Sequence, residues 1–230
     1  MKRRVVVFAL TALLALLVSQ AGISAANADD SLRSQPADSL VNAAAQGDLA
    51  HVSRLLAART DPNTASKSTS LALPLVQAAA NGHGGVIAAL LRAGAAVDTR
   101  DGRGQRALVV AAYHGRLDVC RQLLAAGARV DSAADDELAP LVAGALSGNV
   151  AITDLLLQAG ASAAHTDRAG RNALVAAAAS GNATMVETLL AALGKQHDMG
   201  ESSLLLRARS AAAQAQHAPV ASLINQQIKP

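Results

Sequence analysis

One cysteine, six histidines and one short acidic run are the residues whose chemistry could be catalytic or metal-binding. Cys120 lies between Arg116 and Arg121, and a nearby cation can lower the pKa of a thiol enough to make it reactive. A redox protein or an enzyme that uses Cys120 is therefore one alternative function. A free cysteine on an apolar helix is more often a small core residue, and we expect Cys120 to be one.

The histidines and acidic residues form no recognisable metal or catalytic pattern. No H-x-x-x-H pair and no cysteine at zinc-ligand spacing occurs among His51, His83, His114, His165, His197 and His217. The run Asp135-Asp136-Glu137 lacks the glycine-spaced oxygen ligands of a calcium loop. No Ser/His/Asp or paired-carboxylate arrangement emerges. The sequence therefore predicts no catalytic residue, no metal and no cofactor, and favours a protein that binds another macromolecule.

The segment 1–28 has the three parts of a secretory signal peptide. Lys2, Arg3 and Arg4 are basic, an uncharged and mostly aliphatic run extends from Val5 to Val18, and Ala26-Asn27-Ala28 is an A-x-A cleavage site. The alternative is a retained membrane anchor. A helix as short as this run spans only about 21 Å, however, and a bilayer core is about 30 Å thick. We therefore expect cleavage after Ala28 and no membrane span in the mature chain.

The balance of charge argues against nucleic acid as a partner. The segment 1–28 holds three of the 20 Lys and Arg residues and none of the 17 Asp and Glu residues, so the remainder has 17 of each and is formally neutral. Phe8 lies in the predicted leader, which leaves Tyr113 as the sole aromatic residue of the mature chain. Nucleic-acid binding normally needs a basic stripe and aromatic stacking platforms.

The mature chain is expected to reside in the periplasm or to be secreted. Abundant alanine, and arginine in excess of lysine, are typical of a high-GC bacterium, which with the leader favours this localisation. One cysteine cannot form an internal disulfide, so the fold must be stable in an oxidising compartment by packing alone. We expect a monomer.

An internal repeat organises the rest of the chain. Gly47, Gly82, Gly115, Gly148 and Gly181 recur at nearly equal intervals, of which only the first is longer than the others, by two positions. Each glycine separates two short apolar patterns of helical period, and the second pattern carries a leucine pair, such as 90/91 or 123/124. Asp38 is the predicted N-cap of the first helix, and the Ser/Thr-rich stretch 64–70 is a predicted loop that holds the two extra positions of the first interval.

These motifs resemble the ankyrin-repeat family, whose period is about 33 residues and matches the later intervals. Pro74-Leu75 stands where the family has the Pro-Leu of T-P-L-H, Ala78-Ala79 follows at the family spacing, and Gly82-His83 closes the first helix. The family histidine is replaced by Val41, Val76, Val109, Val142 and Val175, and its threonine by Leu73, Arg106, Ala139 and Asn172. These replacements predict looser loop tips than in a consensus protein.

The resemblance implies an all-α solenoid of stacked helix-turn-helix units with projecting loops. We expect about five repeats and a degenerate C-terminal cap, because the pattern loosens beyond Gly194. The predicted boundaries are a signal peptide at 1–28, a flexible lead-in at 29–37 and a repeat domain at 38–228. The repeats occupy about residues 38–70, 71–105, 106–138, 139–171 and 172–203, and the cap occupies 204–228.

In this family the binding surface is usually the concave side, formed by loop tips and by exposed positions of the first helices. Position by position, the resemblance implies a protein-binding set of Gln77, Asn81, Arg103, Val110, Tyr113, His114, Asp135, Asp136, Leu146, Ser147 and Arg168. Tyr113 is the leading candidate, since tyrosine is enriched at interface hot spots, and Leu146 would extend its apolar patch one repeat along. Alternatively, Tyr113 merely covers the neighbouring helix.

The loop tips alternate in charge. The first of these tips carries Asp98, Arg100, Asp101, Arg103 and Arg106, the next carries Asp131, Asp135, Asp136 and Glu137, and the third carries Asp167, Arg168 and Arg171. An acidic tip between two arginine-bearing tips could orient a charged partner. The alternative is that these charges form only a solvated edge.

The function that the resemblance implies is a non-enzymatic scaffold. We expect it to be exported and to engage another protein through the concave face. Small exported bacterial members of the family are similar to proteins that support or protect periplasmic enzymes such as catalases. An immunity or inhibitor protein against a periplasmic toxin is an alternative within the binding class.

Overall fold

The computed structural model describes residues 36–131, 138–167, 169–196 and 202–228. The predicted signal peptide 1–28 and most of the predicted lead-in therefore lie outside the described residues. Within them every regular element is a helix: 36–46, α2 (Leu49–Ala57), α3 (Pro74–Asn81), α4 (Gly84–Arg92), α5 (Ala107–Tyr113), α6 (Leu117–Ala125), α7 (Pro140–Leu146), α8 (Val150–Gln158), α9 (Ala173–Ser180), α10 (Ala183–Lys195), α11 (Ser202–Gln214) and α12 (Ala218–Asn225). The predicted all-α solenoid is confirmed.

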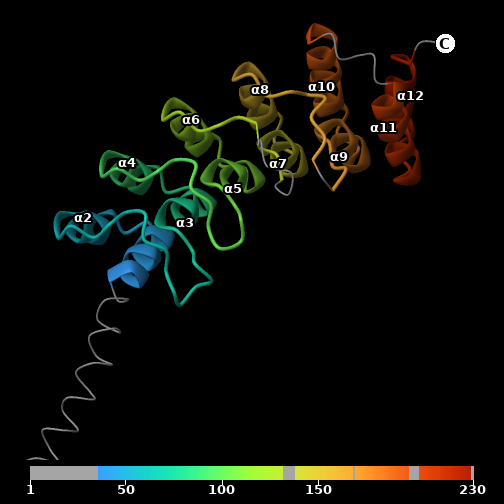
Figure 1. The fold of residues 1–230 in the computed structure, drawn as a ribbon. Helices are drawn as coiled ribbons and strands as arrows, with labels where there is room; N and C mark the ends of the chain where they lie inside the picture. Colours follow the sequence, from blue (N-terminus) through green and yellow to red (C-terminus); the bar gives the residue numbers. More distant parts are fainter. Residues whose placement is uncertain (1–35, 132–137, 168, 197–201, 229–230) are drawn as a thin grey trace, which may run out of the picture.

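The helices form two layers that curve along the stack (Figure 1). The inner layer consists of helix 36–46, α3, α5, α7, α9 and α11, and the outer layer of α2, α4, α6, α8, α10 and α12. From α3 to α12 each helix contacts its own partner in the other layer, and from α2 onward successive helices of one layer contact each other. Loops project from the inner layer on the concave side, so the inner helices and these loops together form the concave face (Figure 1).

The turn between the two helices of a repeat depends on a left-handed residue. Gly82 has φ of 83° and caps α3 by donating its backbone N–H to the last turn. Gln216 has φ of 64° at the corresponding turn of the last helix pair, where the other repeats have glycine. A left-handed conformation is unfavourable for a residue with a Cβ. The last helix pair, α11 and α12, thus departs from the repeat pattern at this turn, and its role as a degenerate cap stays a prediction.

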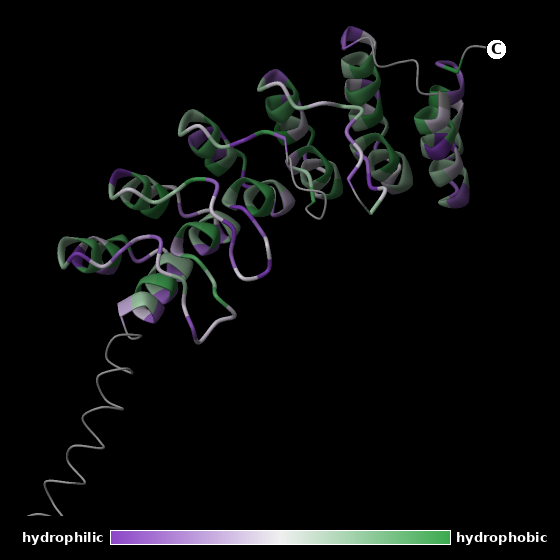
Figure 2. Ribbon diagram, viewed as in Figure 1, coloured by the Kyte–Doolittle hydropathy of each residue, from purple (hydrophilic) through white to green (hydrophobic). Residues whose placement is uncertain are grey.

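The core runs continuously between the layers. Alanines such as Ala78, Ala111 and Ala177 are fully buried in the inner helices and let neighbouring repeats approach closely. One leucine of most pairs is fully buried behind them, as in Leu90, Leu123, Leu156 and Leu189. Each such leucine contributes about 1.5–3 kcal/mol. Figure 2 shows hydrophobic residues in every helix pair, whereas much of the hydrophilic colour lies in the projecting loops.

The first helix begins earlier than expected. It includes Pro36 and Ala37, and Ala37 is only 5% exposed. Proline is accepted in the first turn of a helix, where its missing N–H would have no partner. The prediction that Asp38 is the N-cap was wrong. Asp38 lies within the helix and accepts a hydrogen bond from Ser66 Oγ at 2.5 Å.

Side chains in the loops tie neighbouring repeats together. Asn63 Oδ1 accepts a hydrogen bond from the backbone N–H of Ala96 at 2.8 Å, and its Nδ2 donates to the carbonyl of Gly94 at 3.1 Å. One repeat later, Asp98 Oδ1 accepts from the N–H of Arg129 at 3.1 Å. These hydrogen bonds join the loops of neighbouring repeats although the threonine and histidine of the family motif are absent. That the tips are looser than in a consensus protein stays a prediction.

Candidate protein-binding surface

Two large apolar side chains are exposed on adjacent inner helices. Tyr113 ends α5 and is 51% exposed, and Leu146 ends α7 and is 49% exposed. They occupy the same position in successive repeats, and α5 packs directly against α7. The ring of Tyr113 meets that of His114, also exposed, edge to face at a centroid distance of 5.4 Å. This face therefore presents an apolar patch to solvent midway along the stack.

Val110 does not belong to this surface, contrary to the prediction. It is 6% exposed and is part of the hydrophobic core cluster. At the same position in other repeats, Asn42 is exposed, Gln77 is half-buried and Ala143 is fully buried. The alanine-rich inner helices pack closely enough to cover short apolar side chains at this position, whereas the longer polar side chain of Gln77 still reaches solvent.

Two other predicted surface residues already make structural hydrogen bonds. Asn81 is exposed, but its Nδ2 donates to the carbonyls of Ala45 and Gln77, both at 3.1 Å. Ser147 Oγ donates to the carbonyl of Gly144 at 2.7 Å at the end of α7. A partner that used these groups would have to share or replace the existing bonds.

Only some of the charged residues that were predicted at the loop tips are exposed to solvent. Arg103 is exposed, but Asp101 and Arg106 of the same loop are only 8% and 6% exposed, so they are not tip charges. Asp101 Oδ1 accepts hydrogen bonds from the backbone N–H groups of Arg103 and Gln105, each at 2.9 Å. This carboxylate therefore shapes the loop instead of facing a partner.

The structure does not describe the predicted acidic tip. Asp135, Asp136 and Arg168 lie outside the described residues. Charge steering by these tips therefore stays a prediction. Asp167, next to the undescribed Arg168, is 8% exposed and pairs with Arg171, whose Nε lies 2.6 Å from Asp167 Oδ2. The Asp167 carboxylate therefore forms an ion pair within its own loop.

A cavity of about 220 Å³ opens at the N-terminal end of the concave face. Its lining comes from helix 36–46, from α3 and from two loops: Val41, Asn42, Ala45, Thr69, Ser70, Ala72, Gln77, Asp101 and Arg103. Gln77 and Arg103 were predicted as binding residues, but the cavity itself was not. The sequence signal was the short insertion in the Ser/Thr-rich stretch 64–70, whose end forms one wall.

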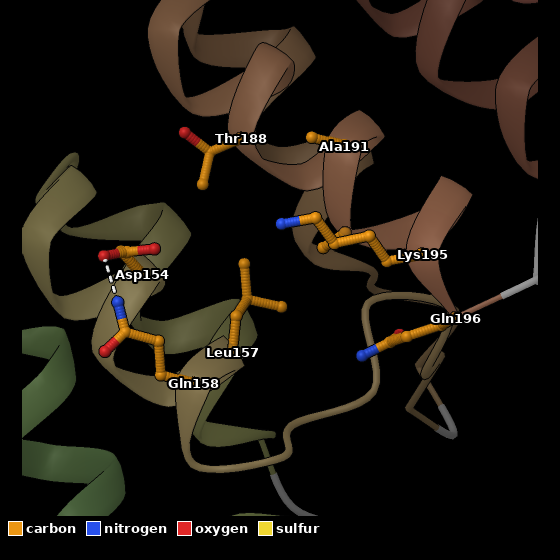
Figure 3. Close-up of a pocket in the computed structure, with 8 residues that line it drawn as sticks. Asp154, Leu157, Gln158, Thr188, Ala191, Lys195 and Gln196 are labelled. Carbon is orange, nitrogen blue, oxygen red and sulfur yellow. Dashed lines mark hydrogen bonds between the residues drawn. The ribbon is translucent and has the colours of Figure 1, made fainter.

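A second hollow lies between the outer helices α8 and α10. Its volume is about 430 Å³, and Asp154, Leu157, Thr188 and Lys195 are among its lining residues. Figure 3 shows the Lys195 side chain extending into the gap between the two helices, while Asp154 is bonded to Gln158. No sequence pattern indicated this groove, which lies on the layer opposite the concave face.

Cys120 is a core residue. It is 0% exposed on α6, where Val119 and Leu123 are also buried, and desolvation by burial raises its pKa to about 12. A thiol in this environment is protonated at neutral pH and inaccessible, whereas a reactive cysteine needs a thiolate and solvent access. The structure therefore gives no support to chemistry at Cys120.

The described part of the chain contains neither a cluster of metal ligands nor a membrane-spanning helix. No group of three or more His, Cys, Asp or Glu side chains there is arranged to hold a metal ion. None of the described helices is long and apolar enough to cross a membrane.

Comparison with known families agrees with the architecture. Residues 40–134 match the family described as ankyrin repeats (3 copies), and residues 141–190 match the family described as ankyrin repeats (many copies). Together the two matches cover more than half of the chain, which belongs to the ankyrin-repeat family. Ankyrin repeats generally mediate protein–protein interactions, and the proteins that contain them are typically non-enzymatic scaffolds. A search of curated proteins gives no match.

Proposed function

We propose that this chain is a non-enzymatic scaffold that binds a partner protein through its concave face. The observation that carries the proposal is the pair Tyr113 and Leu146, two half-exposed apolar side chains on adjacent inner helices. A folded monomer gains nothing from leaving a tyrosine and a leucine exposed side by side. A partner that buries them gains the hydrophobic contribution of both.

The place of action that we propose is the periplasm, and the partner is a resident enzyme of that compartment. The basic, aliphatic and A-x-A segments within residues 1–28 support export. Small exported ankyrin proteins resemble those that support or protect enzymes such as catalases, so we propose an enzyme of this kind as partner. The scaffold acts as a monomer and uses no cofactor.

The experiment is capture of the partner from a periplasmic fraction by the exported, tagged protein. The double variant Tyr113→Ala/Leu146→Ala is compared with Leu49→Ala, which truncates a leucine of the outer helix α2 that is 44% exposed. We expect one stoichiometric enzyme with the wild type and with Leu49→Ala, and its loss with the double variant. Equal capture by all three proteins would contradict the proposed face.

The effect on the captured enzyme separates support from inhibition. A supporting scaffold preserves or raises the activity of the enzyme under stress. An immunity or inhibitor protein abolishes the activity of a toxin in the same assay. The alternative of an immunity protein is thereby tested on the same purified pair.

A further inference from the structure

Two loops that wall the cavity at the N-terminal end of the concave face are joined by backbone contacts. The loop that follows α4 touches the loop that precedes α3: the N–H of Gly102 donates to the carbonyl of Leu71 at 3.0 Å. A Cβ at Gly102 would overlap the carbonyl oxygen of Ser70, so the two backbones are in direct contact. The buried Ser66 anchors the first of these loops, since its Oγ bonds Asp38 at 2.5 Å and Thr69 Oγ1 at 2.7 Å. The cavity is therefore formed before any ligand arrives.

Two carboxamides face this cavity from adjacent inner helices. Asn42 of helix 36–46 and Gln77 of α3 stand at the same position of successive repeats, and both line the cavity. Neither side chain is hydrogen-bonded to another residue in the described part of the chain. Each carboxamide offers a donor and an acceptor side by side, which matches the N–H and C=O of a peptide unit. Further along the stack the same position is Val110 and Ala143, so this pair of amides occurs only at this end.

The middle of the concave face, formed by α3, α5, α7 and α9, carries no charged residue in its helices. The two carboxylates near the cavity are engaged: Asp38 by Ser66, and Asp101 by backbone N–H groups of its own loop. A charged side chain pressed against these helices would lose its hydration and find no opposite charge, which is strongly unfavourable. Arg103 also lines the cavity and is exposed, but it belongs to the loop after α4 and not to an inner helix.

We propose that Asn42 and Gln77 bind the main chain of an extended, uncharged segment of the partner, whose apolar side chain then contacts Tyr113 and Leu146. This inference rests on the proposed function and specifies the chemistry of the partner. Inner helices pack about 8–10 Å apart, so the path from helix 36–46 across α3 and α5 to α7 is about 24–30 Å. An extended chain covers that distance in about seven to nine residues.

The test uses a displayed library of random peptides of about 12 residues, long enough to span that path. Peptides are selected on the immobilised full-length mature protein and sequenced. We expect the selected pool to be depleted of Asp, Glu, Lys and Arg relative to the input pool and to carry a large apolar residue. A pool enriched in charged residues, or no enrichment at all, would overturn the inference.

The role of the amides is measured on a synthetic peptide from the selected pool by fluorescence anisotropy. Asn42→Ala/Gln77→Ala should weaken binding about tenfold or more, because two hydrogen bonds are lost. The matched control Gln122→Ala removes an exposed carboxamide from the outer helix α6 and should leave the affinity unchanged. Raising the salt from about 0.05 M to about 0.5 M should change the affinity less than about twofold, since no ion pair is involved.

Failure of the inference is distinguishable from failure of the proposed function. If Tyr113→Ala/Leu146→Ala abolishes capture of the natural partner but Asn42→Ala/Gln77→Ala leaves peptide affinity unchanged, the scaffold function stands and the amide site is excluded. Peptide binding that is lost in the amide variant, together with partner capture that is lost in both double variants, supports the inference. Gln77→Glu, which keeps the shape of the side chain but adds a charge, should weaken peptide binding at least as much as Gln77→Ala.

Discussion

The imidazole of His83 lies directly over Gly47 of the preceding repeat. A Cβ built on Gly47 would be 2.6 Å from His83 Nδ1, closer than any real Cβ contact. On the other side of the ring, Nε2 donates to the carbonyl of Ala45 at 3.0 Å, since a carbonyl can only accept. The same relationship recurs between Gly181 and His217, where the Cβ would again lie 2.6 Å from the ring. The glycine that ends the first helix of one repeat and the histidine of the next repeat therefore form a direct contact between repeats.

Gly47→Ala should destabilise the protein through both conformation and contact. Gly47 has φ of 75°, which costs an alanine about 1–2 kcal/mol, and the new methyl group also displaces the His83 ring. The matched control is Gly148→Ala, because Gly148 has φ of 74° but nothing within 4 Å of its Cβ position. We expect Gly47→Ala to lower the free energy of unfolding in urea by about 2 kcal/mol more than Gly148→Ala. Equal losses would show that the ring contact contributes nothing.

The thiol of Cys120 should be unreactive in the native protein. Its burial predicts no labelling by a thiol reagent until the chain is unfolded. The pKa of the thiol, about 12 in the folded state against 9.0 for an unperturbed group, also predicts a pH dependence. Above pH 9.0 the unfolded chain releases the thiol proton while the folded chain keeps it, so stability falls as the pH rises towards about 12.

The slope of that fall is at most about 1.4 kcal/mol per pH unit. It is isolated as the difference between wild type and Cys120→Ala, because all other alkaline titrations are common to both proteins. If the two proteins lose stability in parallel above pH 9.0, the folded state does not hold the thiol neutral.

The hydrogen bond between Ser66 and Asp38 should stabilise the protein at neutral pH and lose this effect at acid pH, whereas the effect of Cys120 is lost at alkaline pH. The hydrogen bond from Ser66 lowers the pKa of Asp38 below 3.8 and outweighs the opposing effect of desolvation. A lowered folded-state pKa stabilises the protein above pH 3.8, and this contribution is lost as the pH falls through the folded-state value. Ser66→Ala should therefore cost about 1.5–3 kcal/mol at neutral pH and less at acid pH.

The Asp38→Asn background completes this test. Asparagine keeps the shape of the side chain but has no charge, so Ser66→Ala should cost less there, and its cost should not change with pH. A Ser66→Ala effect of the same size in both backgrounds would mean that Ser66 acts through Thr69 instead of through the carboxylate.

Local sequence signals predict the architecture, but they do not predict which side chains are exposed and unbonded on the concave face. The left-handed turn at Gly82 and the buried leucines are properties of each repeat alone, so the regular glycine and leucine pattern predicts them. The exposure of Val110 depends instead on how closely neighbouring helices approach. The side chain of Asn81 likewise donates a hydrogen bond to the carbonyl of Ala45, which belongs to another repeat, so the sequence of its own repeat does not reveal this bond.

The N-terminal cavity could not be predicted for a similar reason. It arises because the loop after α2 folds back onto Asp38 and meets the loop of the next repeat at Gly102. Both contacts join segments about one repeat apart in the sequence, and no local pattern of residues specifies them. An insertion marks where such a contact can form, but the shape of the wall follows only from the packed structure.

The Tyr113 and Leu146 pair should affect binding far more than stability. Both side chains are about half exposed, so Tyr113→Ala/Leu146→Ala should change the free energy of unfolding by less than about 1 kcal/mol and leave the helical circular dichroism signal unchanged. Each truncated hot spot costs about 2 kcal/mol or more of binding energy, so partner affinity should fall by about a thousandfold if the two losses add. Affinity is measured by calorimetry with the purified partner, and the two single variants form a double-mutant cycle. A loss of stability that matches the loss of affinity would mean that Tyr113 and Leu146 cover the neighbouring helices and are not the binding surface.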